Sequence, residues 1–478
     1  MAMLGKRRPK RAPSGVSGLQ GRKSDDRHAP AASQGPELLE IQGLAHDGRG
    51  VARTAEGKTV FVDGALPGER VRVAVHRTRQ RFDEAHVREL ETPSAERVVP
   101  PCPHFGRCGG CDLQHLALPG QRRHKQEVLT ELLGRQGISL EDAPELLAGE
   151  GEGYRRRARL GVKVDADGRV HLGFRARHTH RLVDIASCTV LVPALEALLT
   201  PLHQQLSALE APRQVGHLEL LESDRGVVLV VRQLREHAGD TRRWQAFAEA
   251  QGVHLARWLG REAPAFEWLT PAPALECRVP GPAGELPLRV EPGDFLQANA
   301  EVNRLMVAAA LSWLSPHVGK ARLLDLFAGI GNFSLPLAAA GARVATAEGN
   351  PAMVERLAGN AHANGLAIEA HQADLNDPAA VRELLAATRP EVVVLDPPRE
   401  GAEAVSQALV AHPVPHLLYV SCDPATLARD AAHLLHGGYR IVRAAVADMF
   451  VHTSHLESML MFEFTGSTRD PQGAPSDG

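Results

Sequence analysis

The sequence predicts a multidomain protein of the α/β and β class, with a small N-terminal β barrel, a central mixed domain and a C-terminal Rossmann-like domain. Its 478 residues are too many for one hydrophobic core. Short segments in which apolar and polar residues alternate fill the region up to about Glu96, as expected for a barrel. From about Leu288 onward, apolar strands alternate with helical segments and glycine turns, which is typical of an open α/β sheet.

The composition excludes several classes of protein. Hydrophobic residues make up 44% of the chain, charged residues make up 23%, and the net charge is -3, as in ordinary globular proteins. No run of about 18 apolar residues occurs, so no membrane span is expected. No apolar signal-peptide core follows the basic N-terminus, and six cysteines in a chain of this length do not suggest a secreted disulfide scaffold. A cytoplasmic location is therefore expected.

Residues 1–36 are expected to form a disordered basic tail. Lys and Arg are concentrated there and large apolar side chains are almost absent, so no packed core can form. Basic tails either contact nucleic acid or only keep a protein in solution, and the residues leave both interpretations open. Residues 467–478 are expected to form a second disordered tail.

Residues 37–96 carry the barrel pattern. The stretch "KTVFVDGALPGERVRVAV" alternates apolar and polar residues around Val60–Val62 and Val71–Val75, with a turn at Pro67-Gly68 between them. A small barrel of the OB type fits this length. Such barrels bind single-stranded nucleic acid along a basic groove, but they also serve as plain structural modules.

Three of the six cysteines fall within "PCPHFGRCGGCDLQHL", which opens the region of residues 97–287. Cys102, Cys108 and Cys111 are spaced C-x5-C-x2-C among glycines, which let a backbone fold tightly around a small object. A four-cysteine iron–sulfur cluster needs one more ligand, and "DIASCTVL" offers Cys188. This pattern favours a 4Fe–4S cluster, while His104 and His115 keep a zinc site open as an alternative.

The segment from Tyr154 to Arg181 is the most basic part of the expected folded chain. Lys and Arg far outnumber Asp there, and "ARLGVKV" and "VHLGF" have the pattern of strands, so several cationic side chains can share one face. A polyanion such as a nucleic acid is a sensible partner for such a face. The alternative is a charged surface that contacts only solvent.

The stretch "ARLLDLFAGIGNFSLPLAAAGARVATAEGN" predicts a strand, a glycine turn, a helix and a second strand that ends at Glu348. Gly329 and Gly331 let the turn approach a ligand, and a carboxylate about 20 residues later can bind the two hydroxyls of a ribose. Position 334 is Ser where a dinucleotide fingerprint has its third glycine. The form Asp325-x-Phe-x-Gly-x-Gly therefore favours S-adenosylmethionine over a dinucleotide.

The later strands carry candidate binding and catalytic residues at their ends. "EVVVLDPPREG" places Asp396 at the carboxyl end of a buried parallel strand, where ligands bind in open α/β sheets. The next strand, in "HLLYVSCDPATLARD", ends at Cys422, which is either a nucleophile or a buried strand-end thiol. "VHTSHLESMLMFEF" places Glu457 before the last strand, as a general base or as a surface carboxylate.

Taken together, these segments resemble the RNA uracil-C5 methyltransferase family, from about Glu37 to Phe464. "HDGRGVAR" with "FVDGALPGERV" resembles its N-terminal TRAM domain, and "CPHFGRCGGCDLQHL" with Cys188 is similar to its 4Fe–4S ligand set. The resemblance implies a TRAM barrel over 37–96, a central domain with the cluster and a basic RNA-binding surface over 97–287, and a methyltransferase domain over 288–466. It also implies the site residues. The donor pocket would contain Gln297, in "FLQANAEVN", together with Phe327, Asn332, Glu348, Asp374 and Asp396.

The same resemblance assigns Cys422 as the nucleophile and Glu457 as the base that removes a proton. The implied reaction transfers a methyl group from S-adenosylmethionine to carbon 5 of a uridine in large-subunit rRNA, through a covalent bond between cysteine and C6 of uracil. Another rRNA uridine or a tRNA is the alternative substrate. Asp423 is expected to point away from the thiol, because its charge would oppose a thiolate. A monomer is expected.

Particular residues count against three rival functions. A cytosine-C5 methyltransferase would place a second cysteine on the strand that carries Asp396, and there is none. A radical enzyme would need an open iron, usually held by C-x3-C-x2-C, whereas the first spacing here is five residues and a fourth cysteine is present. An iron–sulfur RNA-binding protein with a degenerate methyltransferase fold conflicts with the intact set of candidate donor and catalytic residues.

Overall fold

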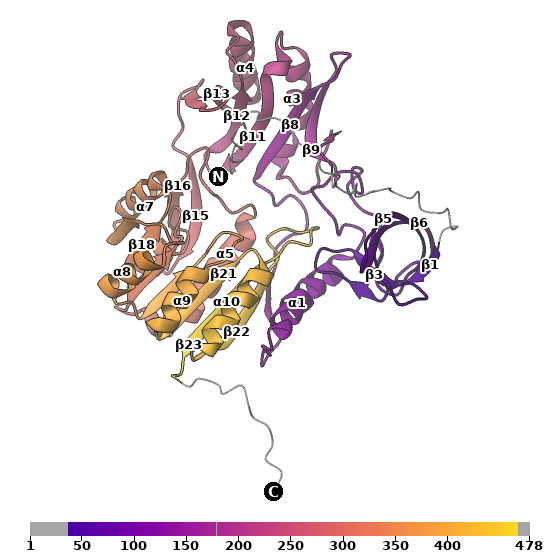
Figure 1. Cartoon of the computed structure of the whole chain (residues 1–478). Coiled ribbons are helices and arrows are strands. Elements are labelled where there is room, and N and C mark those ends of the chain that lie inside the picture. Colours follow the sequence, from indigo (N-terminus) through magenta and orange to yellow (C-terminus); the bar gives the residue numbers. More distant parts are fainter. Residues whose placement is uncertain (1–36, 178, 467–478) are drawn as a thin grey trace, which may run out of the picture.

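A computed structural model describes residues 37–177 and 179–466. The two predicted tails, 1–36 and 467–478, lie outside these residues. Figure 1 shows a small barrel, a second β-rich part and a large α/β part, with one long helix between the barrel and the α/β part. None of the described helices is long and apolar enough to cross a membrane.

The N-terminal part is a six-stranded sheet that curls into a barrel (Figure 1), as expected. Alternation explains it, because Val60 and Val62 of one strand and Val71 and Val73 of the next are buried while their neighbours are more exposed. The sheet order is β1-β5-β6-β4-β3-β2. Its strands are β1 (Glu37–Glu40), β2 (Gly43–Leu44), β3 (Gly50–Arg53), β4 (Thr59–Asp63), β5 (Arg70–Thr78) and β6 (Phe82–Thr92).

The central part is a seven-stranded sheet of order β10-β9-β8-β11-β12-β13-β14. Its strands are β8 (Arg157–Val164), β9 (Val170–Arg175), β10 (Leu182–Asp184), β11 (Val215–Ser223), β12 (Gly226–Gln233), β13 (His254–Leu259) and β14 (Ala265–Trp268). A leucine- and valine-rich core joins it to α2 (Pro193–Glu196), α3 (Leu199–Ser207) and α4 (Ala238–Gln251), and a short 3-10 helix spans Pro212–Gln214. The hairpin of β15 (Glu276–Gly281) and β16 (Gly284–Arg289) leads to the C-terminal part.

The C-terminal part is an eight-stranded sheet of order β19-β18-β17-β20-β21-β23-β22-β7. Along the chain it contains β17 (Arg322–Leu326), β18 (Arg343–Glu348), β19 (Ile368–Gln372), β20 (Val392–Leu395), β21 (His416–Ser421), β22 (Tyr439–Ala447) and β23 (Glu457–Phe464). The first five are parallel, and β23 runs antiparallel between β21 and β22. Strands buried on both faces require continuous apolar runs, and all four residues of β20 are buried.

Helices cover both faces of this sheet. One face packs on α8 (Pro378–Thr388), α9 (Glu403–Ala411) and α10 (Pro424–His436). The other packs on α5 (Ala300–Val318) and α6 (Ser334–Ala339), while α7 (Pro351–Ala363) contacts β18, β19 and β16. The predicted Rossmann-like architecture is confirmed.

Two segments within residues 97–287 belong physically to the C-terminal sheet. Helix α1 (Leu118–Arg135) packs Val128, Leu129 and Leu133 into the same core as α10, and it lies between the barrel and the sheet in Figure 1. Strand β7 (Glu145–Leu147) pairs in parallel with β22 as the edge strand. The expected boundary at residue 288 would assign both segments to the central domain, whereas they pack with the C-terminal sheet.

Candidate active site

The strand order of the C-terminal sheet reverses between β17 and β20, because the chain continues from β17 toward β18 on one side and later returns to β20 on the other. In open α/β sheets, ligands bind at the carboxyl ends of the strands at such a switch point. Asp325 lies near the end of β17 and Asp396 directly follows β20. The predicted donor-binding edge is therefore the place where these two carboxylates meet.

The glycine turn after β17 has a backbone that ordinary residues rarely adopt. Gly331 has a φ of 102°, and a Cβ there would collide with Leu335 Cδ1. Phe327 shares the left-handed region with a φ of 63° and is held by its N–H, which donates to the Ala347 carbonyl at 2.9 Å. Glu348 faces this turn, because its carboxylate accepts the Gly329 N–H at 3.2 Å and the Asn350 N–H at 2.8 Å.

Asp325, the first residue of the Asp325-x-Phe-x-Gly-x-Gly motif, is the most buried acid of this edge. Its side chain is 1% exposed, and Ser334 Oγ donates to its Oδ2. Oδ1 has no hydrogen-bond partner in the described part of the chain. Burial, then the nearby Asp396 and Glu348, raise the pKa of Asp325 to about 7. A buried acceptor without a partner fits a bound ligand that brings a donor or a positive charge, as S-adenosylmethionine does.

The remaining predicted donor residues come from three places. Asn332 exchanges two amide hydrogen bonds with Asn303 of α5, at 2.8 and 3.0 Å. Gln297 is 6% exposed in the segment before α5, and its carbonyl accepts from Arg156 Nε at 3.0 Å. Asp374 lies exposed after β19, where its Oδ1 accepts the Asn376 N–H at 3.0 Å. The turn, Asn332, Glu348 and Asp396 share one edge, and Asp374 lies at its rim.

Cys422 and Glu457 are neighbours because of strand register. Ser421 of β21 pairs with Ser458 of β23, so one step further along the antiparallel ladder Cys422 lies opposite Glu457. The two side chains interact, since the charge of Glu457 is one of the causes that raise the pKa of Cys422. The sequence placed both residues at strand ends, and the structure brings them together.

The charges of this site act on one another. Burial, then Glu457 and Asp396, raise the pKa of the Cys422 thiol to about 12, while Arg399 opposes the rise. Burial, then Asp396, raise the pKa of Glu457 well above its ordinary value, again against Arg399. Burial alone raises the pKa of Asp396 to about 7. Perturbed groups of this kind cluster where proton transfer takes place.

Asp423 points away from the thiol, as expected. Its Oδ1 accepts the N–H groups of Ala425 and Thr426 at 3.0 and 3.2 Å, so that it caps the N-terminus of α10. Asp423, next to the candidate nucleophile, therefore stabilises the turn that leads into α10.

The four cysteines of the predicted cluster site converge, although Cys188 is distant in the chain from the other three. Burial, then Cys188, Cys108 and Cys102, raise the pKa of Cys111 to about 12. The loop is tied to β9 because the Gly109 N–H donates to the Arg175 carbonyl at 2.9 Å, and the Gly110 N–H donates to Cys108 Sγ at 3.4 Å. All six cysteines are free thiols.

The histidines of this loop do not close a compact metal site. Among residues 37–177 and 179–466, no three thiols, carboxylates or imidazoles that include this loop have ligand atoms within 4.8 Å of one another. The ring nitrogens of His104 and His115 are buried and lack hydrogen-bond partners in the same residues. Burial, then Arg97, lower the pKa of His115 to about 4, so its ring is neutral.

Some cations of the basic segment from Tyr154 to Arg181 are buried and form hydrogen bonds within the fold, and others are exposed. Arg156 is 6% exposed and ties β8 to the segment before α5, where its N–H donates to the Ala298 carbonyl at 3.0 Å. Arg157 donates to the Leu296 carbonyl at 3.1 Å and lies over the ring of Phe295, which is 59% exposed. Five other cations of the segment are exposed, namely Arg159, Lys163, Arg169, Arg175 and Arg181. Part of the predicted basic segment therefore supports the fold, and the rest is available at the surface.

A doubly wound sheet with a glycine turn, two buried carboxylates at its switch point and a thiol opposite a carboxylate defines a class, the S-adenosylmethionine-dependent methyltransferases with a cysteine at the site. Within that class, the chain belongs to the tRNA (uracil-5-)-methyltransferase family, whose model matches residues 120–464. The TRAM domain model matches residues 38–87.

Named relatives are close. The chain is 65% identical to the 23S rRNA (uracil(1939)-C(5))-methyltransferase RlmD of Halomonas elongata over 483 residues, which cover 100% of both chains. It is 56% identical to the protein of the same name from Chromohalobacter salexigens, over 99% of this chain and 97% of that one. The fold is similar to that of the Pyrococcus abyssi tRNA (uracil-54, C5)-methyltransferase in complex with S-adenosyl-L-homocysteine, with a TM-score of 0.69 and 22% identity over 89% of this chain and 100% of that one. The predicted family, TRAM barrel and methyltransferase fold are confirmed.

Proposed function

We propose that the chain transfers a methyl group from S-adenosylmethionine to carbon 5 of one uridine in 23S rRNA, the uridine that corresponds to position 1939 in the names of its relatives. The observation that carries this proposal is Cys422 opposite Glu457, beside Asp396 and at the edge of the glycine turn. A thiol nucleophile and a carboxylate base within reach of one ring are the pair that this chemistry requires.

Cys422 is the proposed nucleophile. Its sulfur forms a bond to C6 of uracil, and the electron pair of the C5=C6 bond moves onto C5 and O4 as an enolate. Because the pKa of the thiol is about 12 before substrate binds, the proton must leave as the sulfur attacks. Asp396 is the proposed acceptor of that proton, since its pKa of about 7 leaves much of it ionised near neutral pH.

Glu457 is the proposed base of the second half of the reaction. When bound, S-adenosylmethionine supplies an electrophilic sulfonium methyl group, which C5 takes as a neutral thioether leaves. Glu457 then removes the proton from C5, the electrons of that bond restore C5=C6, and the bond from C6 to Cys422 breaks. The thiolate recovers a proton from Asp396, and Glu457 releases its proton to solvent.

The donor is proposed to lie against the glycine turn. Its pocket would contain Gln297, Phe327, Asn332, Glu348, Asp374 and Asp396. Glu348 is well placed for ribose hydroxyls because it already faces the turn. The open acceptor of Asp325 suits the positively charged end of the donor.

The cysteine loop is proposed to hold a 4Fe–4S cluster on Cys102, Cys108, Cys111 and Cys188. In a tetrahedral zinc site, Zn–S bonds of about 2.3 Å would put the thiolates about 3.8 Å apart. Among the described residues, no three of these thiols all lie within 4.8 Å of one another, so they do not form such a compact zinc site, and four cysteines are the ligand set of a 4Fe–4S cluster. The Gly110 N–H toward Cys108 Sγ is the kind of bond that stabilises a bound sulfur.

The RNA partner is proposed to lie across the TRAM barrel, the exposed cations of β8 and the active-site edge. The target base must leave its stack to reach Cys422, at a cost of a few kcal/mol, which favours loops over duplex RNA. Because its substrate is ribosomal, the protein is proposed to act in the cytoplasm. A monomeric state stays a prediction.

One experiment tests the function. Purified protein and its Cys422→Ala variant are incubated with radiolabelled S-adenosylmethionine and either unmodified 23S rRNA or unmodified tRNA. We expect labelled 5-methyluridine in 23S rRNA with the wild type and none with the variant. Labelling of tRNA instead would refute the rRNA substrate, and equal labelling by the variant would refute the nucleophile.

A further inference from the structure

Residues 448–456 form the loop that joins β22 to β23 and ends at the proposed base, Glu457. The loop is buried along much of its length, since Asp448 is 1% exposed, Val451 0% and Thr453 5%. His452 has a φ of 66°, a left-handed conformation that a non-glycine residue keeps only where its surroundings impose it. Two sets of contacts impose it here.

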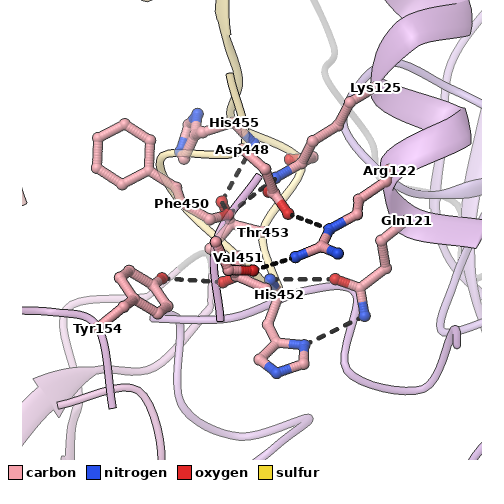
Figure 2. Close-up of polar contacts among 12 residues, drawn as sticks. Gln121, Arg122, Lys125, Tyr154, Asp448, Phe450, Val451, His452, Thr453 and His455 are labelled. Carbon is pink, nitrogen blue, oxygen red and sulfur yellow. Dashed lines mark hydrogen bonds and ion pairs between the residues drawn. The ribbon is translucent and has the colours of Figure 1, made fainter. Parts of the chain in front are cut away.

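Helix α1 provides the first set of contacts, which Figure 2 shows. Lys125 Nζ, fully buried, donates to Asp448 Oδ1 at 2.6 Å and to the Phe450 carbonyl at 2.9 Å. Arg122 Nε donates to the other oxygen of Asp448 at 3.1 Å.

Gln121 of the same helix is 1% exposed and forms hydrogen bonds with His452, the residue in the left-handed conformation. Its Oε1 accepts the His452 N–H at 3.1 Å, and its Nε2 lies 3.1 Å from His452 Nδ1 (Figure 2). The same amide donates to the Leu116 carbonyl at 2.7 Å, so its orientation is fixed. Gln121 thus holds the backbone of His452 in its left-handed conformation.

The cysteine loop provides the second set. The N–H groups of Asp112 and Leu113 both donate to the His452 carbonyl at 3.0 Å. The Asp112 carboxylate accepts the Ser454 N–H at 2.7 Å and the Ser454 hydroxyl at 3.0 Å. Asp112 directly follows Cys111, so the loop that carries the proposed cluster ligands is bonded to the loop that carries the base.

We propose that α1 and the cysteine loop together position Glu457, and that Gln121 and Asp112 are positioning residues for removal of the C5 proton. This inference rests on the proposed function. Cys422 belongs to a different turn, which the Asp423 cap and α10 hold. Loosening residues 448–456 therefore displaces the base and leaves the nucleophile in place.

The chemistry gives this displacement a signature. Addition of Cys422 and methyl transfer do not use Glu457, but release of the product does. An enzyme whose base is displaced accumulates a covalent protein–RNA complex that already carries the methyl group, with the C5 proton and the bond from sulfur to C6 still in place. A general loss of folding would instead remove the complex and the turnover together.

The test uses two variants. Gln121→Leu removes the hydrogen bonds from α1 to His452 and keeps those from the cysteine loop. Asp112→Ala removes the carboxylate that accepts two hydrogen bonds from Ser454. Asp240→Ala is the matched control, because Asp240 is also buried and also accepts two backbone N–H bonds, from Glu210 and Ala211, but far from the site. Each full-length protein is mixed with 23S rRNA and methyl-labelled donor, and the label is counted in free RNA and in complexes that survive denaturing gels.

For both test variants we expect turnover to fall about tenfold or more, with a matching rise in labelled covalent complex. Amide hydrogens of residues 448–456 should also exchange faster than in wild type and in Asp240→Ala. Turnover like wild type, or loss of turnover without labelled complex in a folded protein, would overturn the proposal. If Asp112→Ala does not fold, Ser454→Ala, which removes only the hydroxyl bond, takes its place. A wild type that labels no RNA would refute the proposed function instead.

Discussion

The ion pair between Lys125 and Asp448 is the most buried charge pair in the described residues, and its disruption gives a sharp prediction. Both side chains are 1% exposed, and Nζ lies 2.6 Å from Oδ1. In Lys125→Met the apolar stem is kept and the ammonium is removed. Asp448 then retains Arg122 as a partner, at 3.1 Å.

The expected cost follows from that remaining partner. Removing one member of a buried ion pair costs about 3–5 kcal/mol, because an uncompensated charge is left behind. Arg122, whose side chain is 21% exposed, still compensates part of the charge on Asp448. We therefore expect a loss of stability near the lower limit of that range, about 3 kcal/mol. A loss of about 3 kcal/mol lowers the melting temperature of a domain of this size by about 6–12 °C.

A double variant makes this prediction specific. In Lys125→Met/Asp448→Leu no buried charge lacks its partner, and Arg122 can turn to solvent, so we expect recovery of about half of the loss or more. Scanning calorimetry of wild type, both single variants and the double variant measures the two effects. A single variant that melts within about 2 °C of wild type, or a double variant whose loss equals the sum of the singles, would refute the reasoning.

Three further predictions follow from the site. The rate of methyl transfer is expected to rise as pH increases through about 7, because Asp396 must be ionised to accept the Cys422 proton and burial raises the pKa of Asp396 to about 7; a rate that does not change with pH across this range would contradict this. Ser334→Ala removes the bond to Asp325 and is expected to lower the free energy of unfolding by about 1–3 kcal/mol, measured by denaturant melts; an unchanged stability would count against this bond. Cys188→Ala is expected to lose bound iron by metal analysis, whereas Cys277→Ala, a core thiol, should keep it; equal iron in both would remove Cys188 from the ligand set.

The site strands were predictable because their signals are local. Apolar runs that end in Asp396 or Cys422 indicate parallel strands, and the carboxyl ends of such strands meet at one edge. The glycine turn and Glu348 follow from spacing along a single strand–helix–strand unit. The barrel was equally predictable, because alternation within β4 and β5 decides which side chains are buried.

The connection between the cysteine loop and the base could not be predicted. Asp112 and Ser454 are 342 residues apart in the chain, and nothing local marks them as partners. Strand β7 has three residues, too few for any periodicity, and it is a strand only because β22 offers it an edge.

Charged side chains in the interior were also hidden from sequence analysis. Arg156 and Lys125 look like surface cations in the sequence, and their burial depends on carbonyls and carboxylates that tertiary packing brings to them. Such residues carry no local signal of burial.

The most direct measurement of the central claim is the identity of the residue that bonds to RNA. Glu457→Gln, which cannot remove the C5 proton, is incubated with 23S rRNA and S-adenosylmethionine, digested with nuclease and protease, and analysed by mass spectrometry. We predict a peptide containing Cys422 that carries a methylated uridine nucleotide. An adduct on another cysteine, or free 5-methyluridine formed at the wild-type rate without any adduct, would contradict the account.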